Sequence, residues 1–272
     1  MKTGIIIPCY NEESRLDKNA FINFIVNHDD YHLCFVNDGS RDETLKVLYQ
    51  MKSTIPSRIS VVDIKKNVGK AAAVRAGVRF LYHMKDISNI GFMDADLSTD
   101  FRDFKDLVRT LDSDDKLSVV FGSRNIGGKG IKRDGFRLLL SNIIKLCICR
   151  LIKMPIRDTQ CGAKVFTKSI IPVVYGNAFV SRWLFDVEIF LRLRKYLGSK
   201  NVMSRICEQP LMRWVHVEDS RLGLRDSIRI PFRLLSIWLV YSVLSNFQLI
   251  ETPSEDYMSF EVIESPQLKI AA

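Results

Sequence analysis

The sequence predicts an α/β fold in which an open, mostly parallel sheet is flanked by helices. Over roughly the first 120 residues, short apolar runs alternate with stretches of about ten to fifteen residues that have a helical pattern, as in βαβ units. The apolar runs end in polar residues, as buried parallel strands do where they reach an open sheet edge. In the central run, Ile90, Phe92 and Met93 lead directly into Asp94 and Asp96.

The first half of the chain is predicted to form five strands with helices between them. The strands are expected at 4–9, 33–37, 59–64, about 90–93 and 118–122. The helices are expected at about 15–28, at 42–51, from the turn at 67 to about 84, and at 101–111. Right-handed crossovers would place these helices on the faces of the sheet.

The second half has a different organisation. We expect an apolar helix at 136–154, a polar turn and short strand at 157–168, a helix at 183–197 and a strand at 201–209. The domain boundaries predicted from these changes are one α/β domain at 1–220, amphipathic helices at 221–250 and a tail at 251–272. The tail mixes acids with prolines and is expected to be disordered.

The composition limits the class of partner. The 272-residue chain has 40 Lys and Arg against 31 Asp and Glu, a net charge of +9, which suits phosphates, a membrane surface or nucleic acid. Nucleic acid is disfavoured because the charge lacks interleaved surface aromatics and any recognisable module. The six cysteines form no CxxC pair, which argues against zinc and favours a reducing compartment. No secretory signal is visible, and the apolar run at 234–244 is shorter than the ~20 residues of a spanning helix.

The acids after the central strand predict a metal site. In open α/β sheets, ligands lie outside the carboxyl ends of the strands, so Asp94 and Asp96 would face a ligand. Two carboxylates this close repel each other unless a cation lies between them, and their hard oxygens suit Mg²⁺ or Mn²⁺. Such a cation would have positions left for phosphate oxygens. The alternative is that this stretch caps the next helix through Ser98, Thr99 or Asp100.

Other strand ends would meet at the same edge. The stretches 8–12 and 37–40 offer Tyr10 to stack on a base and a carboxylate to accept a base N–H, although 38–40 also fits an ordinary turn. Lys70 follows a glycine at a predicted helix N-terminus, where backbone N–H groups favour an anion. Neither a P-loop nor GxGxxG is present, which argues against a dinucleotide oxidoreductase.

In order and spacing, these motifs resemble family two glycosyltransferases. The resemblance is carried by the stretches 5–13, 37–42, 67–70, 94–96 and 122–124. It implies a GT-A fold, a nucleotide sugar bound through a metal-bound DxD, and inversion at the anomeric carbon. The later stretches 158–166, 185–188 and 220–222 resemble the dolichyl-phosphate glucosyltransferase and mannosyltransferase branch, with 158–162 closer to the glucosyl members.

The resemblance, which covers about residues 4–235, also implies roles for individual residues. Contacts to the nucleoside are implied for Pro8, Tyr10, Glu12 and Asp38. Contacts to the diphosphate and the metal are implied for Asp94, Ala95 and Asp96, and the acceptor phosphate would be met by Arg124, Arg137 and Ser141. Further substrate contacts are expected from Lys70, Asp158, Gln160 and Arg221, and the catalytic residues would be Asp96, Arg124 and Arg137. The sequence departs from the family at Ser98, where Gln is frequent, and at Arg221, where Lys is usual.

The expected mechanism needs no protein base. A phosphomonoester acceptor has a second pKa of about 6 and is largely dianionic at neutral pH. The acceptor phosphate would attack, arginines would orient it, and the metal would stabilise the departing nucleoside diphosphate. No histidine is assigned a role: His28, His32 and His83 are expected in helix ends or turns, and His216, which could lie near the acceptor, is left unassigned.

The C-terminal segment predicts an interfacial helix. Arg221, Arg225, Arg229 and Arg233 recur every four residues, so a helix would stack them on one face, and Pro231 is expected to begin a second helix. An apolar run with Trp and Tyr follows, which fits a helix lying in the bilayer interface. The helix at 136–154 would be a second such element. Alternatively, both helices pack on the sheet with their arginines in solvent.

The predicted function is transfer of a hexose, glucose from UDP-glucose, to a dolichyl or undecaprenyl phosphate. The protein would be peripheral on the cytoplasmic face of a membrane, and a homo-oligomer or a membrane-protein partner stays open. Two enzyme alternatives are a GDP-mannose donor and a saccharide hydroxyl acceptor, for which Asp186 or Glu188 would be the base. An alternative of another class is a non-catalytic nucleotide-sugar-binding membrane-associated protein, against which the Asp94 and Asp96 pair argues.

Overall fold

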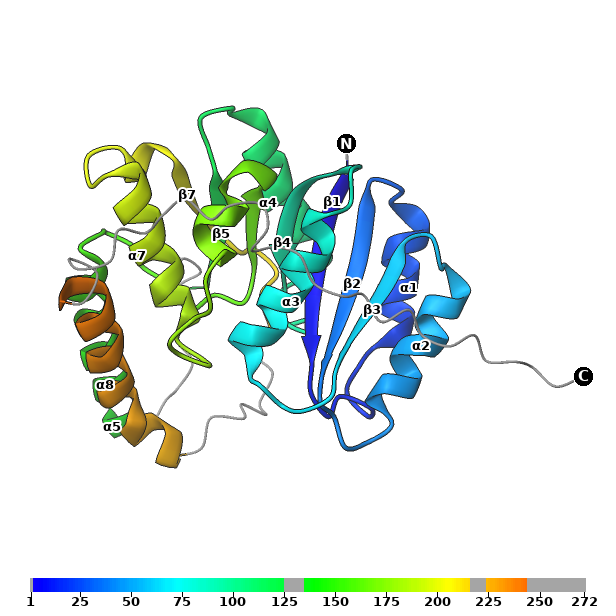
Figure 1. Cartoon of the computed structure of the whole chain (residues 1–272), viewed down its shortest axis with the longest axis horizontal. Helices are drawn as coiled ribbons and strands as arrows, with labels where there is room; N and C mark the ends of the chain where they lie inside the picture. The colour runs from blue at the N-terminus through cyan, green and yellow to red at the C-terminus, as the bar shows by residue number, and fades with distance from the viewer. Residues whose placement is uncertain (1, 125–134, 216–223, 244–272) are drawn as a thin grey trace, which may run out of the picture.

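The fold is built on one mixed sheet with the strand order β3-β2-β1-β4-β6-β5-β7 (Figure 1). A computed structural model describes residues 2–124, 135–215 and 224–243, without the side chains of 135–143, 224–229 and 243. The strands are β1 (Lys2–Cys9), β2 (Tyr31–Asp38), β3 (Ile59–Ile64), β4 (Ile87–Phe92), β5 (Val119–Ser123), β6 (Lys164–Thr167) and β7 (Ile206–Pro210). Both pairings of β6 are antiparallel and the others are parallel. The predicted α/β class, with a mostly parallel sheet, is confirmed.

Helices cover both faces of this sheet (Figure 1). They are α1 (Lys18–Asn27), α2 (Thr44–Thr54), α3 (Lys70–Tyr82), α4 (Phe101–Ser113), α5 (Gly135–Ile152), α6 (Ile171–Tyr175), α7 (Phe185–Leu197) and α8 (Leu224–Trp238). Short turns complete them: the 3₁₀ turns η1 (Lys168–Ile170) and η2 (Val202–Ser204), and the π-helical turn η3 (Leu239–Val243). In the part of the chain that the structure describes, no helix is both long and apolar enough to cross a membrane.

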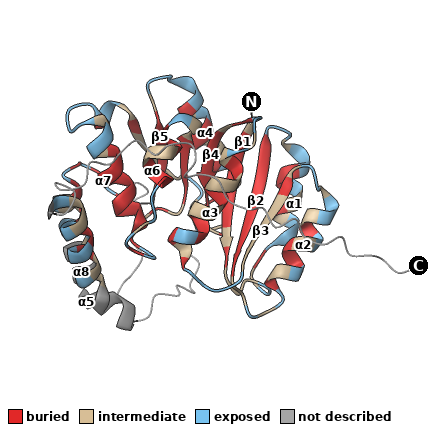
Figure 2. Ribbon diagram, viewed as in Figure 1, coloured by how far each residue is buried: buried red, intermediate tan, exposed pale blue. Residues whose placement is uncertain are grey.

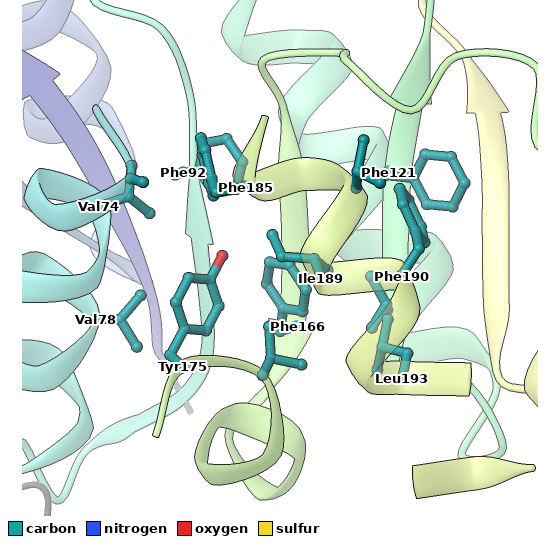
Figure 3. Packing of buried hydrophobic residues seen from close by; sticks show 14 of the residues in the cluster. Val74, Val78, Phe92, Phe121, Phe166, Tyr175, Phe185, Ile189, Phe190 and Leu193 are labelled. Atoms are coloured by element: carbon teal, nitrogen blue, oxygen red, sulfur yellow. The ribbon is translucent and has the colours of Figure 1, made fainter. Parts of the chain in front are cut away.

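The strands alternate their side chains between two hydrophobic clusters, one on each face. Figure 2 shows that the central strands are buried along most of their length. Ile6 of β1 belongs to the cluster with α3 and α7, whereas Ile5 and Ile7 belong to the cluster with α1, α2 and α4. Helix α7 packs through aromatic rings: the centroids of Phe92 and Phe185 are 5.6 Å apart, and those of Phe121 and Phe190 are 5.0 Å apart (Figure 3). This packing holds the start of α7 against the end of β4.

Three local predictions are wrong. The strand expected at 201–209 begins only at Ile206, because Gly198 ends α7 at φ +79° and the chain then forms a turn through η2. Pro231 begins no second helix but lies inside α8, where Leu234 and Ile237 are buried in the core and keep the helix continuous. His32 lies within β2, because that strand pairs with β1 from Tyr31 onward.

The position of His32 generates a prediction for stability. His32 is buried beside the Ser60 hydroxyl, 2.9 Å from its Nε2 atom, and burial lowers the pKa of this imidazole to about 4. The unfolded chain binds a proton there below about pH 6.5, whereas the folded chain does not until about pH 4. Acidification between these values therefore favours unfolding.

We expect the free energy of unfolding to fall by about 1–2 kcal/mol between pH 7 and pH 5 through this group. The variant His32→Gln, which keeps a polar group but cannot titrate, should lose correspondingly less. Urea unfolding at several pH values measures the difference. Parallel pH profiles for the two proteins would contradict the assignment.

Candidate active site

A cleft of about 410 Å³ opens at the carboxyl edge of the sheet. It lies where β1 and β4 are neighbours and the order of the strands along the chain reverses, which is the usual ligand position in open α/β sheets. The residues for which the resemblance implied contacts to the nucleoside, the diphosphate or the metal all line this cleft, and so does Lys70. They are Pro8, Tyr10, Glu12, Asp38, Lys70, Asp94, Ala95 and Asp96. The sequence motifs are therefore brought together as predicted.

Asp94 and Asp96 follow the end of β4 and both face the cleft. An Asp96 carboxylate oxygen accepts the backbone N–H of Ser98 at 3.0 Å, which fixes the turn. Asp94 packs so closely against Gly162 that a Cβ added there would lie 1.9 Å from its Oδ2 atom. The alternative interpretation was that this stretch caps the next helix. Asp100 does cap α4, because it accepts the N–H of Arg102, but Asp94 and Asp96 take no part in that cap.

Lys70, the first residue of α3, forms an ion pair with Asp94. Burial would lower the pKa of this ammonium, but the charges of Asp94, Asp186 and Asp96 outweigh it and raise the pKa above its ordinary value. The lysine is therefore a fixed cation beside the acid pair, at a helix N-terminus that itself favours an anion. This arrangement suits a phosphate group lying between the acids and α3.

The two acids also fit a hard divalent cation. Their oxygens are ligands that Mg²⁺ and Mn²⁺ prefer, and both acids line the cleft, where the missing side chain of Gly162 leaves room for the Asp94 carboxylate. Among the described residues, no group of three or more His, Cys, Asp or Glu side chains could hold a metal. A cation here would thus be held by two carboxylates and complete its coordination with ligand or water oxygens.

Asp38 lines the cleft, but its carboxylate also holds the turn before α3. Its oxygens accept the backbone N–H groups of Val68 at 2.8 Å and Gly69 at 2.9 Å, and the side-chain amide of Asn67 at 3.1 Å. Burial raises the pKa of Asp38, and these hydrogen bonds oppose the rise. Asp38 therefore shapes the cleft wall, a role that the sequence pattern did not indicate.

Arg124, Asp158 and Gln160 do not line the cleft. Asp158 accepts two hydrogen bonds from the Arg124 guanidinium, at 2.7 and 2.8 Å, and one from its backbone N–H. Although burial alone would raise it, the pKa of Asp158 is lowered by these bonds and by the arginine charge. Asp158 thus orients Arg124, and the Gln160 amide nitrogen is buried without a hydrogen-bond partner in the described part of the chain.

Three predicted substrate contacts fall beyond what the structure describes. The side chains of Arg137 and Ser141 lie on α5 outside the described residues, and so does the whole of Arg221. His216 is also outside them. Their roles stay predictions.

The two carboxylates considered as bases, those of Asp186 and Glu188, are bound by other groups of the protein. Asp186 forms an ion pair with Lys164 at 2.6 Å, and both side chains are buried. Glu188 is fully buried and accepts the backbone N–H groups of Val180 and Ser181. Because both carboxylates are buried and already bound by groups of the protein, neither is available to deprotonate an acceptor hydroxyl.

Sequence reasoning missed several residues of the site. Trp183 and Arg15 line the cleft, and the buried Lys164 donates to the Cys161 carbonyl at 2.7 Å, next to the glycine that touches Asp94. No sequence motif marked Trp183; in the structure Ser181 accepts the N–H groups of Trp183 and Leu184 and so fixes the turn before α7. No local signal existed for Lys164, because its partner lies 22 residues away.

The sheet edge, the acid pair and the cation at the start of α3 define an α/β protein with a cleft for a phosphate-bearing ligand. More particularly, residues 4–170 match the model of the family Glycosyl transferase family 2, and the chain belongs to that family. This confirms the resemblance seen in the sequence motifs.

Relatives at about 30% identity are similar to this protein over most of its length. The dolichyl-phosphate beta-glucosyltransferase of Dictyostelium discoideum is 31% identical over 266 residues, which cover 88% of this chain and 77% of the relative. The protein of that name from Homo sapiens is 30% identical over 234 residues, which cover 80% and 69%.

Solved structures share the fold. The glucosyl-3-phosphoglycerate synthase of Mycobacterium tuberculosis, in complex with Mn²⁺, uridine-diphosphate-glucose and phosphoglyceric acid, is similar with a TM-score of 0.65 and 13% identity. The match covers 88% of this chain and 79% of that one. It confirms the predicted GT-A fold class.

The buried pair behind the acids generates a stability prediction. Burial raises the pKa of Asp186, and the charges of Lys164 and Lys70 oppose that rise. Lys164→Met should lower the free energy of unfolding by about 3–5 kcal/mol, because it removes the main partner of a buried anion. Combining it with Asp186→Leu should recover most of the loss.

Urea unfolding at pH 7 compares the single and double variants. A single variant that loses less than about 1 kcal/mol would show that the pair does not hold a buried charge.

Proposed function

We propose that the protein transfers glucose from UDP-glucose to dolichyl phosphate, with inversion at the anomeric carbon and with Mg²⁺ or Mn²⁺ as cofactor. The observation that carries the proposal is the Asp94 and Asp96 pair at the switch point of the sheet, in a chain that belongs to Glycosyl transferase family 2. The names of the relatives favour glucose over mannose and a dolichyl phosphate over a saccharide hydroxyl.

Different residues of the cleft would contact different parts of the donor. Tyr10 and Asp38 lie at the ends of β1 and β2 and would meet the nucleoside, while the ammonium of Lys70 would meet the diphosphate. Asp94 and Asp96 would hold the cation, which supplies positive charge to the departing diphosphate when it is bound. Lys70 is bound to Asp94 here, so a diphosphate would share this lysine with the acid.

The acceptor phosphate needs orientation rather than deprotonation, because it is largely dianionic at neutral pH. Arg124 is the described residue best suited to orient it, since Asp158 fixes the Nε and Nη2 atoms of the guanidinium and thereby its plane. Arg137, Ser141 and Arg221 are proposed to complete the acceptor site. The engagement of Asp186 and Glu188 by the protein supports an acceptor that needs no base.

Transfer itself is the first test. Labelled UDP-glucose, dolichyl phosphate and Mn²⁺ should yield labelled lipid in an organic extract, GDP-mannose should yield far less, and EDTA should abolish the product. Asp94→Asn and Asp96→Asn should each lower the rate by at least about 100-fold, because one charge of the cation site is lost.

Two further variants sharpen this test. Gly162→Ala should also lower the rate, because its Cβ would displace the Asp94 carboxylate. The matched control Asp100→Asn changes a nearby acid that caps α4, pairs with Arg102 and does not line the cleft, so the rate should be nearly unchanged. Transfer that survives EDTA and both cleft variants would reject the metal-dependent mechanism.

We also propose that the protein is peripheral on the cytoplasmic face of a membrane. Helix α8 and η3 bury Leu234 and Ile237 but expose large apolar side chains on another side: Phe232, Leu235, Trp238 and Leu239. Helix α5 lies beside α8 and exposes Leu146 (Figure 1). An apolar surface of this kind on a chain with net charge +9 suits a bilayer with anionic lipids. Six free cysteines support a reducing compartment.

Sedimentation with liposomes tests the membrane proposal. The protein should bind vesicles that contain anionic lipid, and the bound fraction should fall as salt rises because the Debye length shortens. Phe232→Ser with Trp238→Ser should reduce binding at low salt. Val26→Ser, which alters an exposed apolar residue on α1, is the control. Equal sedimentation of the double variant and the control would contradict the assigned surface.

A further inference from the structure

Trp183 forms part of the cleft wall although 37% of its surface is exposed. It precedes α7 and shares the cleft with Lys70 and Ala73 of α3. Among the described residues that line the cleft, the aromatic side chains are those of Tyr10 and Trp183, and Trp183 lies on the side of α3 and α7. A flat aromatic surface in a cleft is suited to packing against a base or a sugar ring.

The loop that carries Trp183, residues 180–184, is clamped on the α3 side. The Arg182 guanidinium donates to the carbonyl oxygens of Asn67 and Val68, each at 2.9 Å. The Arg182 carbonyl accepts the N–H of Ala71 at 3.1 Å. A Cβ added at Gly69 would lie 2.8 Å from Arg182 Nε, so the loop and the turn before α3 touch closely. The turn before α3 is thus held by hydrogen bonds to Asp38 on one side and to this loop on the other.

On its other side the loop is held by a fully buried acid. Glu188 accepts the N–H of Val180 at 2.9 Å and that of Ser181 at 2.8 Å. Ser181 in turn accepts the N–H of Leu184 at 2.9 Å. A buried carboxylate needs such partners, and its hydrogen bonds fix the backbone of the loop just before the wall residue.

The same acid reaches the C-terminal helical segment. The Tyr241 hydroxyl, on η3, donates to Glu188 at 2.9 Å and accepts from Arg192 Nε at 2.8 Å. Arg192 also donates to the carbonyls of Val174, Asn177 and Ala178, which lead into the loop. A continuous set of hydrogen bonds therefore runs from η3 through Glu188 to the loop that carries the cleft wall.

We propose that Trp183 contacts the bound nucleotide sugar, and that Glu188 and Tyr241 are positioning residues that hold its loop, so that the C-terminal helical segment sets one wall of the donor cleft. The inference rests on the proposed function for the identity of the donor. It assigns Glu188 a role in orientation, through its hydrogen bonds to the loop, in place of the base role considered from the sequence.

The test uses Tyr241→Phe, which removes one hydroxyl and no apolar contact. Calorimetric titration of the full chain with UDP-glucose and Mn²⁺ should give a Kd about threefold to tenfold above that of the wild type, because the loop passes on to the donor only part of the free energy of one lost hydrogen bond to a charged group. Trp183→Ala should weaken binding by at least as much. Tyr196→Phe, which removes the hydroxyl of an exposed tyrosine on α7, should change the Kd by less than about 1.5-fold.

A double-mutant cycle separates positioning from general stability. If Tyr241 acts through the loop, Trp183→Ala with Tyr241→Phe should bind UDP-glucose no more than about twofold worse than Trp183→Ala alone. Additive losses would overturn the proposal. So would a Tyr241→Phe protein that melts earlier but binds the donor as the wild type does.

Titration of the wild type tests the identity of the donor. If the wild type fails to bind UDP-glucose, the proposed donor is wrong, and the same cycle is measured with GDP-mannose. If Trp183→Ala binds the donor as tightly as the wild type, the inference is overturned while the transferase assignment stays intact.

Discussion

The repulsion between Asp94 and Asp96 is the constraint on which the site depends. The chain places both acids in one cleft and compensates them with the ammonium of Lys70, which pairs with Asp94. The main chain at Gly162 then closes on the Asp94 carboxylate, which only a residue without a side chain permits. Behind this contact, Lys164 holds the Cys161 carbonyl and so keeps the glycine in place. The acid end of the cleft is thus assembled from three distant segments of the chain.

At the other end of the cleft, the turn before α3 is held by hydrogen bonds from two sides. Asp38, at the end of β2, binds the backbone N–H groups of Val68 and Gly69, while Arg182 binds the carbonyls of the same turn. Both sets are charge-assisted hydrogen bonds, which are about twice as strong as neutral ones. The turn that starts α3 therefore depends on the N-terminal strands and on the loop before α7 together. This explains why the cleft has walls from both halves of the chain.

Much of the site could be predicted because its signals are local. Apolar runs that stop at Pro8, Asp38 and Asp94 mark strand ends, and parallel strand ends share one sheet edge. The partners of Lys164 and Glu188 could not be predicted, because pairing across the fold leaves no periodic pattern in the sequence. The error at Pro231 has the opposite origin: the local preference of proline was correctly identified, but packing in the core outweighed it.

The antiparallel strand β6 has a consequence for the newly made chain. It enters the sheet between β4 and β5, although it follows both in sequence. Until Lys164–Thr167 have left the ribosome, β4 is an unpaired edge whose backbone groups can bind another chain. The strand that delivers the two cleft acids therefore stays open while more than seventy further residues are synthesised, on the order of seconds at ribosomal speed. The strand β4 gains its second neighbour in the sheet only when the later half of the protein arrives.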